Sequence, residues 1–114
     1  MGKVLTNQGL GYLALQQWSQ AESAFTESMN CFQKLADRSM YLNALDGLGI
    51  TYLEQHLYDK ALVIFESVQE QLADIIDTPA YHYLAATISV QLEQAHNKVV
   101  ERGLSTWKPP KRSN

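Results

Sequence analysis

The sequence predicts an all-α fold, an αα-hairpin repeat solenoid made of two helical hairpins and a long C-terminal capping helix. The chain has 114 residues, of which 46% are hydrophobic and 18% charged, and it contains only three Pro and six Gly. One globular helical domain is expected from this composition. Residues 47–62 have the pattern of a helix end, a tight turn near His56 and Leu57, and the start of a second helix. The same pattern occurs forty residues earlier, which indicates an internal repeat.

The repeat is visible when residues 5–28 are compared with residues 45–68. Six identities occur in twenty-four positions, all at residues suited to helix packing: Leu5/Leu45, Gly9/Gly49, Tyr12/Tyr52, Leu13/Leu53, Ala21/Ala61 and Phe25/Phe65. An aromatic pair, Trp18 and Tyr58, adds to them. The small side chains at positions 49 and 61 would let two helices approach closely, with the ring of Tyr52 filling the space beside Gly49.

The first hairpin is expected over residues 3–36. Helix one should span Lys3 to Gln16, with a packed face made of Leu5, Gly9, Leu10 and Leu13. Ser19 and Glu22 have the spacing of a capping box, so helix two should begin there and end near Ala36. Its apolar stripe is Ala21, Phe25, Met29, Phe32 and Leu35.

The second hairpin and the capping helix are predicted from the same signals, capping residues and apolar faces. Asp37 should start helix three, whose buried face is Tyr41, Leu45, Leu48, Gly49 and Tyr52. Asp59 should cap helix four, with an inward face made of Ala61, Leu62, Phe65, Val68, Leu72 and Ile75. Thr78 and Pro79 should open helix five, which runs to about Arg102 before Gly103. The expected organisation is a helical domain over residues 1–103 and a basic, flexible tail over residues 104–114.

Charge and cysteine content limit the classes of partner. Residues 1–103 carry a net charge of −6, and the tail carries +3. An acidic body does not suit a nucleic-acid reader, which needs a basic face. No apolar run is long enough for a membrane span or a signal peptide, so we expect a soluble protein without a membrane partner. The single cysteine, Cys31, fits a reducing compartment, so the expected location is cytoplasmic.

The repeat resembles the tetratricopeptide repeat. Its small and aromatic positions are matched by Gly9, Tyr12, Trp18, Ala21 and Phe25, and again by Gly49, Tyr52, Tyr58, Ala61 and Phe65. The period of forty residues departs from the usual thirty-four, so the resemblance is to a long-period variant. This resemblance implies a protein-binding scaffold.

Catalytic and metal-binding motifs are weak in this sequence. The pairs Gly9–Gly11 and Gly47–Gly49 lack the third glycine and the preceding strand of a phosphate-binding loop, so a packing role is favoured. The three histidines lack the i, i+3 or i+4 spacing of helical metal ligands, and Cys31 has no C-x-x-C companion. No nucleophile elbow or triad motif is present. We therefore expect no enzyme activity, no cofactor and no metal.

The resemblance implies a partner-binding groove formed by the first helix of each hairpin and by helix five. Carrying the family's groove positions across gives Thr6, Leu10, Leu13, Asn43, Asp46, Ile50, Leu53, Glu54, Tyr83, Ala86, Val90 and Glu93. The alternative for Leu13 and Leu53 is that they belong to the core, because solenoid helices bury more than one face.

Two functions are favoured over a third, a small enzyme or cofactor carrier whose site the residue spacing conceals. The first is a non-catalytic adaptor that binds a peptide or amphipathic helix of a protein partner, with apolar anchors and basic flanks that suit an apolar groove edged by acids. The alternative is a self-assembly module that forms homo-oligomers, as part of a larger regulatory or signalling protein, because a short array has open ends. The basic tail, with Leu104 and Trp107, could occupy the groove in cis, or it could simply solubilise the chain end.

Overall fold

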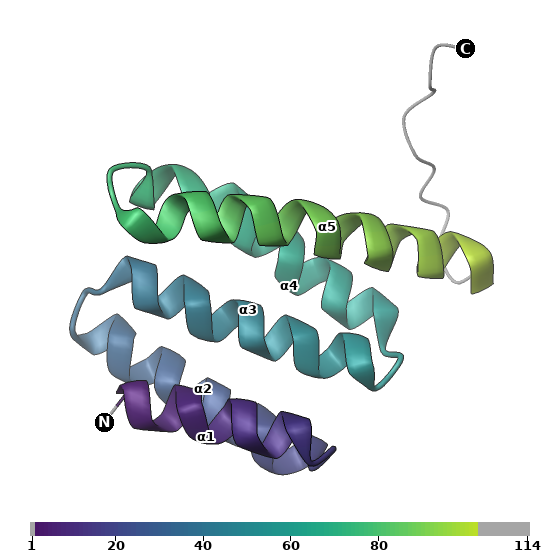
Figure 1. Ribbon diagram of the computed structural model, residues 1–114, viewed down its shortest axis with the longest axis horizontal. Coiled ribbons are helices and arrows are strands. Elements are labelled where there is room, and N and C mark those ends of the chain that lie inside the picture. The colour runs from purple at the N-terminus through teal and green to yellow at the C-terminus, as the bar shows by residue number, and fades with distance from the viewer. Residues whose placement is uncertain (1, 103–114) are drawn as a thin grey trace.

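Helices make up all the regular structure in the computed structural model, which describes residues 2–102. The elements are α1 (Gly2–Ala14), α2 (Trp18–Lys34), α3 (Arg38–Glu54), α4 (Tyr58–Gln71), a 3-10 helix η1 (Leu72–Ile75) and α5 (Pro79–Arg102). The helices α1 and α2 form one antiparallel hairpin, α3 and α4 form the next, and α5 packs against the second hairpin (Figure 1). The predicted all-α fold of two hairpins and a long last helix is confirmed. The tail expected at residues 104–114 and the helix stop expected at Gly103 lie outside the described residues.

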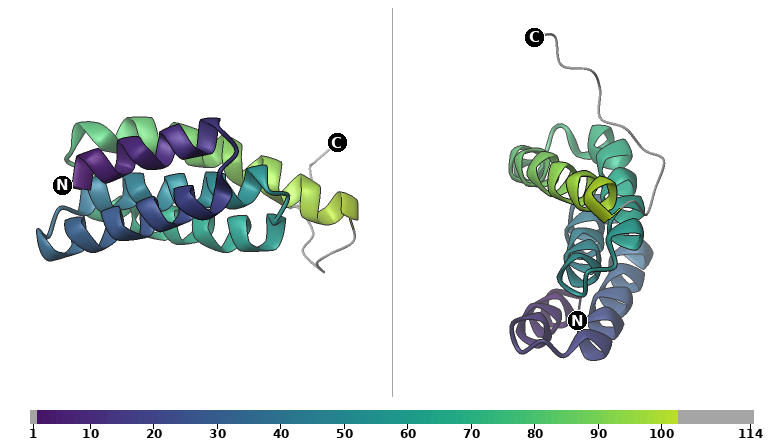
Figure 2. Two further views of the ribbon diagram at one scale, coloured as in Figure 1. Left: turned by 90° about the horizontal axis from the view of Figure 1, so that it is seen from below. Right: turned by 90° about the vertical axis from the view of Figure 1, so that its right-hand side faces the viewer.

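The helices are arranged in two layers. Viewed along the helix axes, α1, α3 and α5 lie on one side of the stack, and α2 and α4 lie on the other side (Figure 2). The stack bends toward the layer of α1, α3 and α5, so these three helices line its inner side. This is the layer in which the sequence places the groove.

Three turns with the same backbone geometry join the first four helices. Gln16, Ala36 and His56 have positive φ angles of 59°, 54° and 64°. In each turn the next amide donates back to the helix that has just ended: Gln17 N to Tyr12 O (2.8 Å), Asp37 N to Phe32 O (2.9 Å) and Leu57 N to Tyr52 O (2.9 Å). This left-handed ending satisfies carbonyls at the helix terminus. It also reverses the chain within three residues, which makes the hairpins tight.

These turns explain why two of the predicted helix starts are wrong. Helices α2 and α4 begin at Trp18 and Tyr58, directly after the turns, and neither has a side-chain cap. Ser19 and Asp59 therefore lie inside the first turn instead of capping it. The expected cap of α3 is confirmed, because the Asp37 Oδ1 accepts from Met40 N at 3.1 Å.

The core is built around two phenylalanine rings that pack against glycines. Phe25 and Phe65 are fully buried. A Cβ atom placed on Gly9 would lie 2.7 Å from the Phe25 ring, one on Gly47 would lie 2.5 Å from the same ring, and one on Gly49 would lie 2.5 Å from the Phe65 ring. These glycines are thus packing positions, as the sequence suggested. The Phe25 ring also joins the two hairpins, since Gly9 belongs to α1 and Gly47 to α3.

Two apolar residues that were expected to be packed are exposed. Leu35 was expected on the buried stripe of the second helix, but it is 71% exposed because α2 ends at Lys34 and the backbone turns there. Leu10 was expected on the packed face of the first helix and is 49% exposed. The predicted inward face of the fourth helix is buried throughout, although its last turn, Leu72–Ile75, is a 3-10 helix.

The capping helix α5 begins at Pro79, the first helical position that the sequence predicts. The Thr78 hydroxyl donates to Ile75 O at 2.7 Å, which stabilises the turn that precedes it. His96 stands eighty residues after Gln16 and forty after His56, yet α5 continues through it to Arg102. The structure therefore extends this helix where the first two hairpins turn back. None of the helices among residues 2–102 is long and apolar enough to cross a membrane.

Candidate functional site

The inner layer of α1, α3 and α5 is the candidate partner-binding site. Nine of the twelve residues that the sequence places in the groove have exposed or half-buried side chains: Leu10, Asn43, Ile50, Leu53, Glu54, Tyr83, Ala86, Val90 and Glu93. We call these nine residues the groove surface. Tyr83 and Val90 of α5 are 66% and 57% exposed.

The remaining three residues of the expected groove are buried: Thr6, Leu13 and Asp46. The Leu13 side chain is part of the hydrophobic core. This position agrees with the alternative interpretation of Leu13 as a core residue. Thr6 and Asp46 occupy equivalent positions in α1 and α3, one repeat apart, and their side chains are 6% and 5% exposed. These three side chains therefore lie in the protein interior and present almost no surface to a partner.

Thr6 belongs to a closed network of polar atoms between α1 and α2. Its hydroxyl lies 2.5 Å from the Ser28 hydroxyl and 3.1 Å from Gly2 O. The Ser28 hydroxyl lies 2.9 Å from Gly2 O. Each hydroxyl has one hydrogen, so one hydroxyl donates to the other and the second donates to Gly2 O. Every hydroxyl in this buried network has a partner, so the network stabilises the hairpin.

Asp46 lies in a different environment. Burial in the second hairpin raises the pKa of its carboxyl to about 6, and an interaction with the Gln91 side chain of α5 partly offsets this increase. Asp46 Oδ1 and Gln91 Oε1 are both buried, and neither atom has a hydrogen-bond partner among the described residues. A buried carboxyl without a cation favours its neutral form.

The acids of the groove surface are solvated. Glu54 and Glu93 are exposed side chains on α3 and α5. They place negative charge beside the apolar side chains of Ile50 and Val90. Such a surface attracts a partner that combines apolar anchors with cationic flanks.

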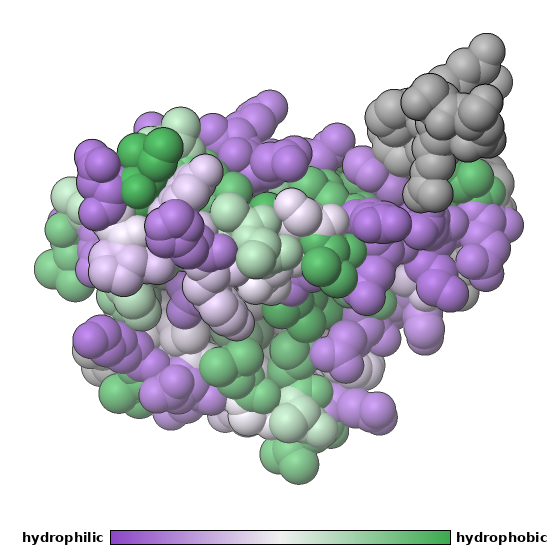
Figure 3. Space-filling model, turned by 45° about the horizontal axis from the view of Figure 1, so that its top comes forward, coloured by the Kyte–Doolittle hydropathy of each residue, from purple (hydrophilic) through white to green (hydrophobic). Residues whose placement is uncertain are grey.

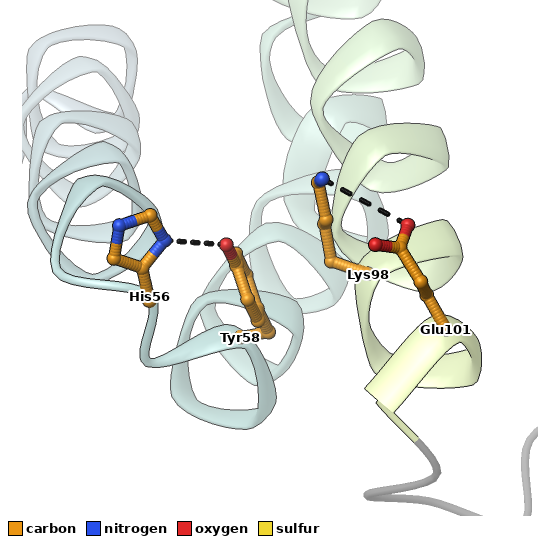
Figure 4. A network of polar contacts seen from close by, with 4 residues as sticks. All are labelled: His56, Tyr58, Lys98 and Glu101. Carbon is orange, nitrogen blue, oxygen red and sulfur yellow. Dashed lines mark hydrogen bonds and ion pairs between the residues drawn. The ribbon is translucent and has the colours of Figure 1, made fainter.

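Two further polar contacts lie away from the groove surface, one at the α3–α4 turn and one near the end of α5 (Figure 4). The His56 Nδ1 and the Tyr58 hydroxyl are 2.5 Å apart, and the Tyr58 side chain is 5% exposed. The Lys98 Nζ lies 3.8 Å from the Glu101 Oε2, in an exposed i, i+3 pair that contributes little stability. The His56–Tyr58 contact joins the residue with positive φ to the first residue of α4, so its role is to fix the turn.

Surface hollows also lie elsewhere on the described residues. One of about 170 Å³ lies at the α2–α3 turn and includes Phe32 and Arg38 in its lining. Another, of about 220 Å³, lies over the outer side of the first hairpin and includes Leu5, Gln8 and Tyr12. Neither hollow is lined by the groove surface. Among residues 2–102 there is no group of three or more His, Cys, Asp or Glu side chains that could hold a metal ion.

The family assignment follows from the hairpin architecture and from a sequence comparison. A model of the tetratricopeptide repeat family matches residues 1–73, which is more than half of the chain and covers both hairpins. The chain belongs to the tetratricopeptide repeat family. Tetratricopeptide repeats are typically non-catalytic modules for protein–protein interaction. No curated protein and no solved structure matches the chain.

The match ends close to the point where the hairpin pattern ends. Residue 73 lies in η1, directly before the turn into α5. The capping helix is therefore the part of this tetratricopeptide repeat protein that the family model leaves undescribed. It contributes four of the nine residues of the groove surface.

Proposed function

We propose that this tetratricopeptide repeat protein is a non-catalytic adaptor whose groove surface binds a peptide or an amphipathic helix of a protein partner. One observation carries the proposal: large apolar side chains are exposed on the inner layer, at Leu10 of α1 and at Tyr83 and Val90 of α5. The space-filling view shows hydrophobic side chains exposed between hydrophilic ones on this side of the molecule (Figure 3). Exposed apolar surface with a polar rim is typical of interaction sites.

The chemistry of the partner follows from the charges around this surface. Glu54 and Glu93 are exposed beside the apolar side chains, and the net charge of residues 1–103 is −6. The favoured ligand carries Leu- or Phe-type anchors for the apolar side chains and Lys or Arg flanks for the acids. We extend this proposal to location: the half-buried free thiol of Cys31 supports a cytoplasmic protein.

An affinity experiment with matched variants tests the adaptor function. The wild-type protein, used as bait, is compared with a groove variant, Tyr83→Ser/Val90→Ser. The control variant is Val63→Ser/Ile76→Ser, with one change on α4 and one in the turn before α5. Val63 and Ile76 are 64% and 57% exposed, so the control removes a similar exposed apolar area elsewhere. We expect the groove variant to lose a protein that the wild type and the control retain by quantitative mass spectrometry. Equal retention by all three baits would contradict the proposed site.

A second candidate function is self-assembly through the open end of the stack. Leu5 and Gln8 line the outer hollow of about 220 Å³, whereas their counterparts in the next repeat, Leu45 and Leu48, are buried. The first hairpin thus leaves uncovered a helix face that the second hairpin buries. Multi-angle light scattering separates the two functions: a monomer at all micromolar concentrations excludes self-assembly, and a dimer that dissociates in Gln8→Lys supports it.

A further inference from the structure

The three helices of the inner layer run in the same direction, because one antiparallel helix separates each from the next (Figure 1). Their C-terminal ends lie toward one end of the molecule, the right-hand end in Figure 1. Glu54 is the last residue of α3, and Arg102 is the last residue of α5. The chain therefore leaves α5 toward the end of the groove surface at which Glu54 lies.

The chemistry of the groove surface changes toward this end. Val90 of α5 is 57% exposed, and Ile50 of α3 is half-buried. About one helical turn further along the same two helices, Glu93 and Glu54 are exposed. None of the nine residues of the groove surface is a lysine or an arginine. The groove surface thus presents an apolar part beside an acidic end, and it supplies no cation of its own.

The sequence after α5 has the complementary chemistry. Residues 104–114, which we call the basic segment, lie outside the described residues, and they contain no acid. The basic segment has one large aromatic side chain, Trp107, and three cations, Lys108, Lys111 and Arg112. An aromatic anchor flanked by cations is the ligand chemistry that an apolar surface with an acidic edge favours.

The chain between Arg102 and Trp107 is long enough to reach this surface. Trp107 is five residues beyond Arg102, and an extended chain of that length spans at most about 16–18 Å. Along α5, Glu93 and Val90 precede Arg102 by nine and twelve residues, which corresponds to about 14 and 18 Å of helix. Trp107 therefore reaches Glu93 easily and reaches Val90 when the chain is nearly extended.

We propose that the basic segment docks on the groove surface of its own chain. In the docked state, the Trp107 ring packs against Val90, and the cations lie beside Glu54 and Glu93. The segment then covers part of the surface that we assign to the partner, so the partner must displace it. This effect on binding rests on the function proposed above, whereas the docking itself is a property of the free protein.

The tether makes even weak docking effective. A short tether holds its ligand at an effective concentration of about 1 mM. A segment with an intrinsic Kd of roughly 0.1–1 mM would therefore occupy the groove in about half to nine-tenths of the molecules. The apparent affinity for an external partner would fall by about two- to tenfold, since only the unoccupied molecules bind it.

Fluorine NMR of the intact chain tests the docking without a partner. Both tryptophans, Trp18 and Trp107, are replaced by 5-fluorotryptophan, and Trp107→Phe assigns the two resonances. The shift of each resonance between H₂O and D₂O measures the solvent exposure of that indole. We expect this isotope shift to be smaller for Trp107 than for a free fluorotryptophan amide. High salt should increase it toward the free value, because salt screens the contacts with the acids.

Two matched pairs of variants locate the docking site. Val90→Ser should expose Trp107, whereas Val63→Ser should not, although the two valines are 57% and 64% exposed. Glu54→Gln/Glu93→Gln should also expose Trp107. The control Glu27→Gln/Glu70→Gln changes two exposed acids of α2 and α4 and should retain the wild-type value. The Trp18 resonance checks the fold, and the acid variants change only exposed side chains.

Three results would overturn the proposal. They are a fully exposed Trp107 in the wild type, the same exposure in the variants and their controls, and exposure of Trp107 on tenfold dilution. The last result would mean that the basic segment binds the groove of a second copy.

The partner provides a separate test once it is identified. The full-length variant Trp107→Ser/Lys108→Ser should bind it about two- to tenfold more tightly than the wild type. Unchanged affinity would contradict the regulatory effect. A partner that is lost from the groove variant while Trp107 is exposed in the wild type would overturn the docking and support the adaptor function, so the two failures are distinguishable.

Discussion

Replacement of Gly47 by alanine should destabilise the domain, although alanine is the better helix former. Gly47 lies in the middle of α3, and an added Cβ would be 2.5 Å from Cε1 and 2.7 Å from Cζ of the Phe25 ring. The ring cannot retreat freely, because Gly9 of α1 faces the same edge, where a Cβ would lie 2.7 Å from Cε1. Alanine at position 47 must therefore push α3 away from α2 or force the ring out of its preferred position.

The magnitude is set by two opposing terms. Alanine gains about 1 kcal/mol over glycine in a helix interior. Overpacking of a close-packed core costs about 1–3 kcal/mol, and the upper part of that range applies because Phe25 is fully buried. We expect a net loss of about 1–2 kcal/mol for Gly47→Ala, which lowers Tm by about 4–8 °C at this chain length.

Thermal denaturation followed by circular dichroism measures this loss, with Gly11→Ala as the matched control. Gly11 is an exposed glycine of α1, and a Cβ added there would meet nothing within 4 Å. The control should gain up to about 1 kcal/mol from helix propensity alone. A Gly47→Ala protein that is as stable as Gly11→Ala would refute the role of Gly47 as a required close contact.

Three further predictions concern the turns, the buried hydroxyls and the groove acids. Ala36→Gly should raise the free energy of unfolding by about 0.5–1 kcal/mol in urea, because Ala36 has a φ of 54° that glycine adopts without a Cβ penalty; a loss of stability would contradict this. Ser28→Ala should cost about 1 kcal/mol, and the double variant Thr6→Val/Ser28→Ala should recover part of it, because both hydroxyls are then absent; additive losses would argue against the network. Once a partner is identified, Glu54→Gln should weaken binding and flatten its dependence on salt, whereas Glu70→Gln, an exposed acid of α4, should change neither; equal effects would remove Glu54 from the site.

The repeat of small and aromatic residues was sufficient to predict the fold. The pairs Gly9/Gly49 and Phe25/Phe65 are each separated by forty residues. The glycines let neighbouring helices approach closely, and the phenylalanine rings pack against them. The contact between Gly47 and Phe25 could not be predicted in the same way. It joins two different hairpins, and the comparison of one hairpin with the next carries no information about contacts between them.

The helix starts were the least predictable local feature. Ser19 and Asp59 are good capping residues, but the preceding turns place the helix start one residue before each of them. Those turns use Gln16 and His56 in a left-handed conformation, which their residue types do not indicate. Turn chemistry therefore offered no signal for the position of the helix starts.

The burial of Asp46 is the clearest difference between the expected and the observed site. A charged residue on a helix that lines a groove is usually solvated, and nothing in the residues around Asp46 indicates its burial. Helix α3, however, lies between α1 and α5 in its own layer and packs against both α2 and α4. A helix with neighbours on so many sides buries side chains on several of its faces, and the Asp46 side chain lies on one of them.

Photo-crosslinking from the groove surface tests the central claim most directly. A photoreactive phenylalanine analogue placed at Tyr83 or at Leu10, both exposed on the inner layer, would be irradiated in cells and the products identified by mass spectrometry. The same analogue at Val63, on the outer layer, serves as the control. The adaptor function predicts one shared protein partner crosslinked from Tyr83 and Leu10 and absent from Val63. No crosslinked protein from either inner position, or the same products from all three, would contradict it.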